Sequence, residues 1–126
     1  MDVEKLEVYK KAFALSILVY KTTRSWNEYW VRDQMMRSVT SVCANLCEMA
    51  GSKTEKEKHH KATIALCEAK ETQFWIKFAH ETGMLPNQTD FINDIDVISK
   101  MLWNYRNAII RKPPSAVSGQ LSGDSL

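Results

Sequence analysis

Two carboxylates, Glu68 and Glu71, are the side chains whose types and positions most suggest chemistry in this chain. On a helical wheel both lie beside Ile64 and Trp75, inside an apolar arc. A carboxylate in apolar surroundings must be paired or protonated, and a pKa perturbed in this way can mark a catalytic site. Arg37 and Asn45, in the preceding predicted helix, are natural partners for these carboxylates. The sequence therefore predicts an ion-paired group that joins two helices.

Arg37 belongs to a stripe of hydrogen-bonding side chains. This stripe lies roughly 120° around its predicted helix from an apolar stripe. The members of this polar stripe are Gln34, Arg37, Ser41, Asn45 and Glu48. Such side chains need partners, so we expect a network in which Arg37 binds Glu68 or Glu71 and Asn45 caps the rest. This network would either fix the register of the helices or form a catalytic pocket. We favour the structural role, closed to solvent, because buried polar groups commonly set helix register.

Other catalytic chemistry lacks the residues that it needs. Di-metal four-helix bundles use Glu from two helices and Glu-x-x-His from the other two, whereas Glu57-x-x-His60 is the only such pair in this sequence. The sequence places no Cys–His pair with an orienting acid, and it contains no Gly-rich phosphate loop. We therefore predict that the protein is not an enzyme and that it uses no metal and no cofactor.

Local basic clusters could contact nucleic acid, although the net charge is only +2, from 17 basic and 15 acidic residues. A strong nucleic-acid binder is typically more basic, and solvated helix faces are the simpler interpretation of any one cluster. The candidate phosphate contacts are Lys10, Lys11, Lys21, Arg24, Lys53, Lys56, Lys58 and Lys61. The residues that could stack on bases are Trp26, Trp30, Trp75 and Trp103, although aromatic residues at helical spacing more often belong to a core.

Four helices must position these side chains. The apolar periodicity and the helix-ending signals predict helices over about residues 2–24, 28–50, 54–82 and 89–112. Thr54-x-x-Glu57 has the pattern of a capping box at the start of the third helix. Long helices joined by short turns predict an all-α fold, an antiparallel up-down-up-down four-helix bundle. The bundle is expected to occupy residues 1–112, and the Ser-, Gly- and Pro-rich residues 113–126 are expected to form a disordered tail.

The predicted helices carry more apolar surface than one bundle needs. The first helix has two apolar stripes. One stripe is Leu6, Tyr9, Phe13, Ile17 and Tyr20, and the other is Val8, Ala12, Leu15 and Val19. Excess apolar surface usually marks an interface, so we expect a homo-oligomer.

Cysteine usage and hydropathy indicate the compartment. The three Cys residues have no zinc-knuckle spacing and form an odd set, which favours a reducing, cytoplasmic environment. The first residues include acids and no apolar core of a signal peptide, and no apolar run approaches the roughly 18 residues that span a bilayer. We expect no contact with a membrane.

Two blocks of sequence carry a resemblance to a known family. The first block is Asp33-Gln34-x-x-Arg37-Ser38-Val39-Thr40-Ser41-Val42-x-Ala44-Asn45-x-x-Glu48. The second is Ile64-Ala65-Leu66-x-Glu68-Ala69-x-Glu71-Thr72-Gln73-Phe74-Trp75, followed by Gly83-x-Leu85. With Val8-Tyr9-Lys10, they resemble the bacterial four-helix-bundle family that includes proteins encoded within intervening sequences of 23S ribosomal RNA genes. The resemblance covers about residues 6–110.

This resemblance implies an antiparallel bundle that assembles as a homopentamer with a central channel. Related proteins are accessory factors of diversity-generating retroelements, in which a basic surface contacts a reverse transcriptase and nucleic acid. Two functional hypotheses follow. The protein binds structured RNA or DNA through basic patches that symmetry repeats, or it is a scaffold for a protein partner such as a reverse transcriptase, with no direct contact to nucleic acid.

Overall fold

Four long α-helices dominate the computed structural model, which describes residues 1–111. Their bounds are α1 Glu7–Thr23, α2 Tyr29–Ala50, α3 Glu55–Glu81 and α4 Phe91–Arg111. A short 3-10 helix, η1 (Val3–Lys5), precedes α1, and residues 1–111 contain no strand. The predicted all-α fold with four helices is therefore confirmed. The predicted tail, residues 113–126, lies outside the described residues.

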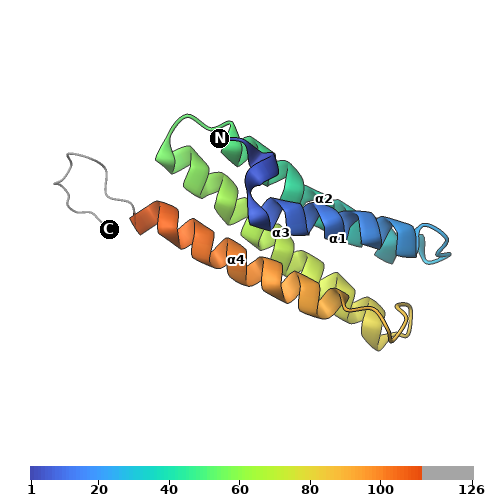
Figure 1. Ribbon diagram of the computed structural model, residues 1–126. Helices are drawn as coiled ribbons and strands as arrows, with labels where there is room; N and C mark the ends of the chain where they lie inside the picture. Colours follow the sequence, from blue (N-terminus) through green and yellow to red (C-terminus); the bar gives the residue numbers. More distant parts are fainter. Residues whose placement is uncertain (112–126) are drawn as a thin grey trace.

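The helices lie side by side along one long axis (Figure 1). The α1–α2 turn and the α3–α4 connection lie at one end of the bundle, whereas the α2–α3 turn and the N-terminus lie at the other. Each helix packs against two others, because α2 contacts α1 and α3, and α4 contacts α3 and α1. This arrangement is that of a four-helix bundle with one shared core.

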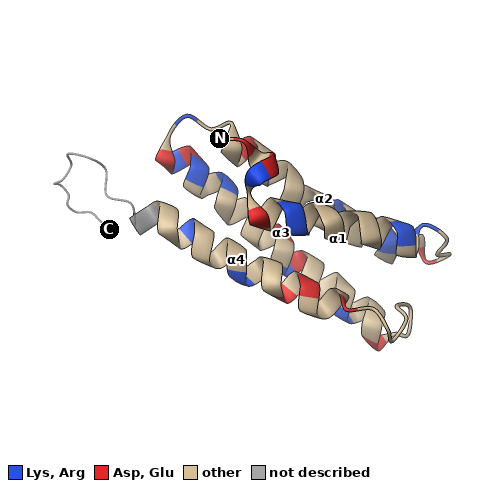
Figure 2. Ribbon diagram, in the orientation of Figure 1, with Lys and Arg blue, Asp and Glu red and all other residues tan. Residues whose placement is uncertain are grey.

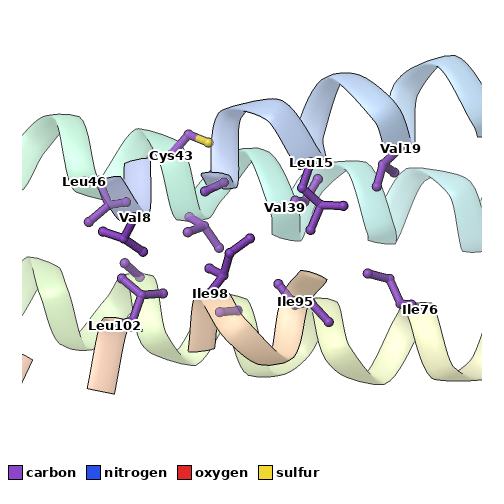
Figure 3. Packing of buried hydrophobic residues seen from close by; sticks show 14 of the residues in the cluster. Val8, Leu15, Val19, Val39, Cys43, Leu46, Ile76, Ile95, Ile98 and Leu102 are labelled. Atoms are coloured by element: carbon purple, nitrogen blue, oxygen red, sulfur yellow. The ribbon is translucent and has the colours of Figure 1, made fainter. Parts of the chain in front are cut away.

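The core is built from the apolar stripes that the sequence predicts. The fully buried stripe of α2 is Val31, Met35, Val39, Val42, Leu46 and Met49. The buried stripe of α1 is Val8, Ala12, Leu15 and Val19, and that of α4 begins with Phe91, Ile95, Ile98 and Leu102. Figure 3 shows members of these stripes pointing inward between the helices. Helix α3 adds the small residues Ala62, Ala65, Ala69 and Ala79, which let its backbone lie close to its neighbours.

The first helix begins later than the sequence predicts, at Glu7 rather than Asp2. Asp2 Oδ1 accepts a hydrogen bond from the backbone N–H of Glu4 at 3.0 Å, which starts η1. Leu6 then has an extended backbone, with φ −82° and ψ 120°, and separates η1 from α1. At the start of the chain, Met1 Sδ lies 3.7 Å from Tyr105 Oη near the end of α4. The N-terminal turn therefore lies against the end of the bundle.

The boundaries of α3 follow from local chemistry. Thr54 accepts a hydrogen bond from the N–H of Glu57 and the Glu57 carboxylate accepts one from the N–H of Thr54, which confirms the predicted capping box. After α3, Gly83 adopts a φ of 79°, a left-handed conformation that glycine takes without steric cost. None of the helices within residues 1–111 is both long and apolar enough to cross a membrane.

Candidate functional site

Arg37 on α2 forms the centre of a polar group with two carboxylates on α3. Its Nη1 donates to Glu68 Oε1 at 3.2 Å, and its Nη2 forms an ion pair with Glu71. Gln34 Oε1 accepts from Arg37 Nε at 3.4 Å, and Trp75 Nε1 donates to Glu71 Oε2 at 3.0 Å. The Arg37 guanidinium, helped by the Trp75 N–H, holds the pKa of the Glu71 carboxyl below its usual value. The structure therefore joins α2 and α3 through the side chains that the sequence pairs.

This group is open to solvent, and the expectation that it is closed is wrong for the single chain. The exposed fractions of the side chains are 46% for Arg37, 21% for Glu68 and 37% for Glu71. The reason is geometric: the two carboxylates lie at the margin of the α3 apolar arc, and the buried part of that arc is made by other residues. The carboxylates face a flank of the bundle instead of its core.

The rest of the polar stripe divides between local and interhelical contacts. Asn45 Nδ2 donates to the Ser41 carbonyl at 2.9 Å and to Ser41 Oγ at 3.1 Å, so it bonds within its own helix and does not cap the Arg37 group. Glu48 accepts from Lys61 Nζ at 2.6 Å, which gives α2 and α3 a second ion pair. Asn45 is therefore placed differently from the prediction.

Four aromatic rings lie on the same flank as the Arg37 group. We call them the aromatic cluster: Trp30 of α2 with Phe74, Trp75 and Phe78 of α3. The Trp30 ring centroid lies 6.0 Å from that of Trp75 and 5.7 Å from that of Phe78, with edge-on geometry in both pairs. Trp30 and Phe74 are each 57% exposed. The cluster therefore presents a large apolar surface beside a charged one.

A second apolar surface lies on α1. Of the two predicted stripes of this helix, one fills the core. The other is divided, because Tyr9 is buried and Leu6 is half-buried against the core, whereas its remaining members face outward. We call the outward residues, Phe13, Ile17 and Tyr20, the α1 face; they are 50%, 40% and 51% exposed. A single chain therefore exposes two separate apolar surfaces, and apolar patches of this kind usually mark contacts with other proteins.

Four of the predicted phosphate contacts gather around the turn between α2 and α3. We call this group the basic turn: Lys53, Lys56, Lys58 and Lys61. Lys53, Lys56 and Lys61 line a cavity of about 680 Å³ together with His60 and two glutamates. Lys58 pairs with Glu55 and Lys61 with Glu48, whereas Lys53 and Lys56 form no side-chain ion pair within residues 1–111. The basic turn therefore offers two uncompensated ammonium groups.

The other four predicted contacts do not join the basic turn. Lys10 pairs with Glu7 at 3.1 Å, and Lys11 lines a small cavity with Asp94. Lys21 and Arg24 lie at the far end of α1, beside the α1–α2 turn (Figure 2). The eight predicted residues therefore form three separate groups along the bundle instead of one patch.

The glutamate of the only Glu-x-x-His pair has a structural role. Glu57 Oε1 accepts two hydrogen bonds from backbone N–H groups, one from Lys53 at 3.1 Å and one from Thr54 at 3.3 Å. In the part of the chain that the structure describes, no three His, Cys, Asp or Glu residues lie close enough together to hold a metal ion.

A comparison with protein families identifies the chain. The family described as 23S rRNA-intervening sequence protein matches residues 4–104. The chain belongs to this family. Among solved structures, it is similar to a protein of unknown function from the S23 ribosomal protein family of Bacteroides thetaiotaomicron, with 27% sequence identity and a TM-score of 0.73. That similarity covers 79% of this chain and 97% of the other. A search of curated proteins gave no match.

The sequence resemblance to 23S rRNA-intervening sequence proteins is thus confirmed, whereas the relation to retroelement accessory proteins stays a prediction. For this family member the structure also shows a cavity between α3 and α4 that was not predicted from the sequence. Lys70 of α3 lines a cavity with Lys100 and Trp103 of α4. The sequence pattern that could have predicted it is Lys100-x-x-Trp103-x-x-Arg106. This spacing places two cationic side chains beside one aromatic side chain on a helix.

Proposed function

We propose that this 23S rRNA-intervening sequence family member is a non-enzymatic, homo-oligomeric protein that binds structured RNA or DNA through its basic turn. The observation that carries the proposal is the cavity of about 680 Å³ at the α2–α3 turn, where Lys53 and Lys56 lack carboxylate partners within residues 1–111. Lysine ammonium groups that are not neutralised by nearby acids are the usual contacts to phosphate.

Assembly would strengthen a site that is weak in one chain. The α1 face and the aromatic cluster are two different apolar surfaces, and contacts between unlike surfaces generate closed rings when the rotation closes. We expect the antiparallel bundle to form a pentamer, as the family resemblance implies. Such a ring repeats the basic turn once per chain, and linked weak sites bind with raised avidity.

A salt titration tests this function. The full-length protein is titrated against a fluorescently labelled RNA hairpin and a labelled DNA duplex, from low to physiological salt. We expect binding that weakens steeply with salt, because each neutralised phosphate contributes about −0.9 to the slope of log K against log salt on duplex DNA. The variant Lys53→Glu, Lys56→Glu should bind at least about tenfold more weakly.

A charge-matched control locates the contact. The variant Lys21→Glu, Arg24→Glu removes the same charge beside the α1–α2 turn, at the opposite end of the bundle from the basic turn. We expect it to lose less affinity than the basic-turn variant. Equal losses in the two variants would indicate a response to net charge alone, and unchanged binding by the basic-turn variant would overturn the assignment.

The second candidate function is a scaffold for a protein partner, such as a reverse transcriptase, without direct binding of nucleic acid. The exposure of Trp30 and Phe74 favours it, because an aromatic surface that stays open after assembly would be available to another protein. Absence of nucleic-acid binding at low salt, together with Trp30 that remains accessible to acrylamide in the oligomer, would favour the scaffold.

A further inference from the structure

We propose that a groove between α3 and α4 binds one nucleotide unit, with the base stacked on Trp103 and the phosphate on Lys70 and Lys100. The groove contains a cavity of about 260 Å³ lined by Lys70, Ser99, Lys100, Trp103 and Asn104. This set combines an aromatic ring, two ammonium groups, an amide and a hydroxyl. A base with its phosphate presents matching groups, namely a π-face, an anion, and hydrogen-bond donors and acceptors.

The groove carries positive charge that nearby acids do not neutralise. Lys70, Lys100 and Arg106 take part in no side-chain ion pair within residues 1–111. Asp96, the acid one helical turn before Lys100, accepts a hydrogen bond from Gln73 Nε2 at 2.6 Å and forms no ion pair with Lys100. Figure 2 shows the acidic residues of α4 toward its start and basic residues further along the helix. The groove is therefore less compensated than the basic turn, where two lysines are paired.

The aromatic ring of the groove is both exposed and supported. Trp103 is 52% exposed. The Arg106 guanidinium lies over the indole, 5.2 Å from the ring centroid, and its Nε donates to His59 Nε2 of α3 at 3.4 Å. Arg106 is therefore a positioning residue that links Trp103 to α3. A ring held in this way can stack on a base of any sequence, because every base has a π-face.

A hydroxyl beside the cavity lacks a partner. Ser99 is 4% exposed, and its Oγ makes no hydrogen bond within the described chain. The Ser99 Oγ is itself buried, so Ser99 forms part of the cavity wall and does not reach a bound group. Asn104 adds an amide that can donate and accept. The exposed Asn104 amide would contact the edge of the base or the sugar.

Two sources could supply this nucleotide unit, a free mononucleotide or an unpaired segment of RNA or DNA. A site for a free mononucleotide stands independently of the basic turn. A site for a single strand rests on the proposed function, because it adds a single-strand contact to a protein that binds structured nucleic acid. The cavity of about 260 Å³ is small, and a base inside a duplex is stacked and paired, so the groove favours unpaired bases.

The test titrates the full-length protein with a labelled ten-nucleotide oligouridylate, with UMP by calorimetry, and with a labelled RNA hairpin. We expect Trp103→Ala to weaken binding of the single strand about tenfold, with little change for the hairpin stem. Trp103→Phe keeps an aromatic face and should restore most of the affinity. The variant Lys70→Gln, Lys100→Gln should flatten the salt slope by about 0.7 for each lost phosphate contact.

Lys77→Gln is the matched control, because Lys77 is an exposed lysine of α3 that does not line the cavity. Circular dichroism and thermal melting of each variant verify its fold. Loss of UMP binding in Trp103→Ala would assign the site to free nucleotides, whereas weakened binding of the oligonucleotide in Trp103→Ala, with no UMP binding by the wild type, would assign it to a strand. Both results support the groove.

Three results would overturn the inference. They are wild-type affinity of folded Trp103→Ala for both UMP and the oligonucleotide, equal salt slopes for the groove double variant and Lys77→Gln, and no binding of either UMP or the oligonucleotide at low salt. The basic turn is judged separately on the hairpin. If Lys53→Glu, Lys56→Glu leaves hairpin binding unchanged while Trp103→Ala weakens the single strand, the proposed function fails and the groove stands.

Discussion

Thr72 Oγ1 of α3 donates a hydrogen bond of 2.8 Å to Ser38 Oγ of α2, and both residues are completely buried. Ser38 Oγ in turn donates to the Met35 carbonyl at 3.1 Å. Each hydroxyl residue directly follows a member of the exposed ion pair, because Arg37 precedes Ser38 and Glu71 precedes Thr72. The buried hydrogen bond therefore fixes the register that places Arg37 against Glu71.

The first prediction concerns this buried hydrogen bond. Ser38→Ala and Thr72→Val should each lower the free energy of unfolding by about 1 kcal/mol, the usual contribution of one hydrogen bond. In each single variant the remaining hydroxyl keeps a carbonyl partner, of Glu68 or of Met35. The double variant should lose less than the sum, because both changes remove the same contact. Urea denaturation measures all four proteins, and strictly additive losses would refute the coupling.

The second prediction concerns the pH dependence of the Arg37 group. Arg37 holds the pKa of Glu71 below its ordinary value of 4.5, so the pair stabilises the fold above pH 4.5. This contribution is lost as the pH falls through the lower pKa of the folded state. Because Arg37 and Glu71 are 46% and 37% exposed, Arg37→Met should cost only about 0.5–1 kcal/mol at pH 7. The cost should shrink as the pH falls below 4.5 and through the lower pKa of Glu71 in the folded state.

Arg32→Met provides the control for that measurement. Arg32 forms an ion pair with its neighbour Asp33, and its guanidinium lies over the Tyr29 ring. All three residues belong to the first turns of α2. Its loss should change stability less than that of Arg37, since it breaks no contact between helices. Urea denaturation from pH 3 to pH 7 would contradict the prediction if Arg37→Met and the wild type differed equally at every pH.

The third prediction ranks the thiols. Cys43 is buried beside Ser16, with 3.6 Å between Sγ and Oγ, and burial raises the pKa of its thiol. Cys47 and Cys67 are exposed. Since the thiolate is the reactive form, iodoacetamide at about pH 8 should modify Cys43 last, as measured by peptide mass spectrometry. Equal rates for Cys43 and Cys47 in the native protein would contradict the prediction, and denaturant should remove the difference.

The fourth prediction concerns assembly through the α1 face. The variant Phe13→Glu, Ile17→Glu should convert the expected oligomer to a monomer in light scattering at micromolar concentration, because it places charges in an apolar contact. Leu18→Glu is the control, since Leu18 is 49% exposed on the same helix but lines the cavity between α1 and α4. A wild-type monomer, or an oligomer that survives the double change, would exclude this interface.

Much of the fold could be predicted from periodicity because burial in a helix repeats with the helical turn. Every member of the α2 stripe from Val31 to Met49 is fully buried, and the stripe of α4 is buried from Phe91 to Leu102. The Thr54–Glu57 capping box was predictable for a different reason, since it depends only on residues in one turn. Contacts of this kind are local, or they follow from one helix facing a common core.

The site was less predictable because a helical wheel gives a direction and not a neighbour. It pairs Arg37 with Glu68 and Glu71 correctly, but it does not show that this flank is open to solvent. For Asn45 the local carbonyl of Ser41 competes with partners on other helices. The groove around Trp103 depends on the distance between α3 and α4, which no single-helix pattern contains.

The contact of Met1 with Tyr105 has a consequence for the order of the helices. It brings the beginning of η1 to the last turns of α4, at the same end of the bundle as the α2–α3 turn. A linker could join the start of η1 to the last turns of α4, and an exposed turn could be opened in exchange. Opening residues 24–28 would give the order α2, α3, α4, η1, α1. The same side-chain packing is then reached by a circularly permuted chain, whose new ends lie far from the basic turn.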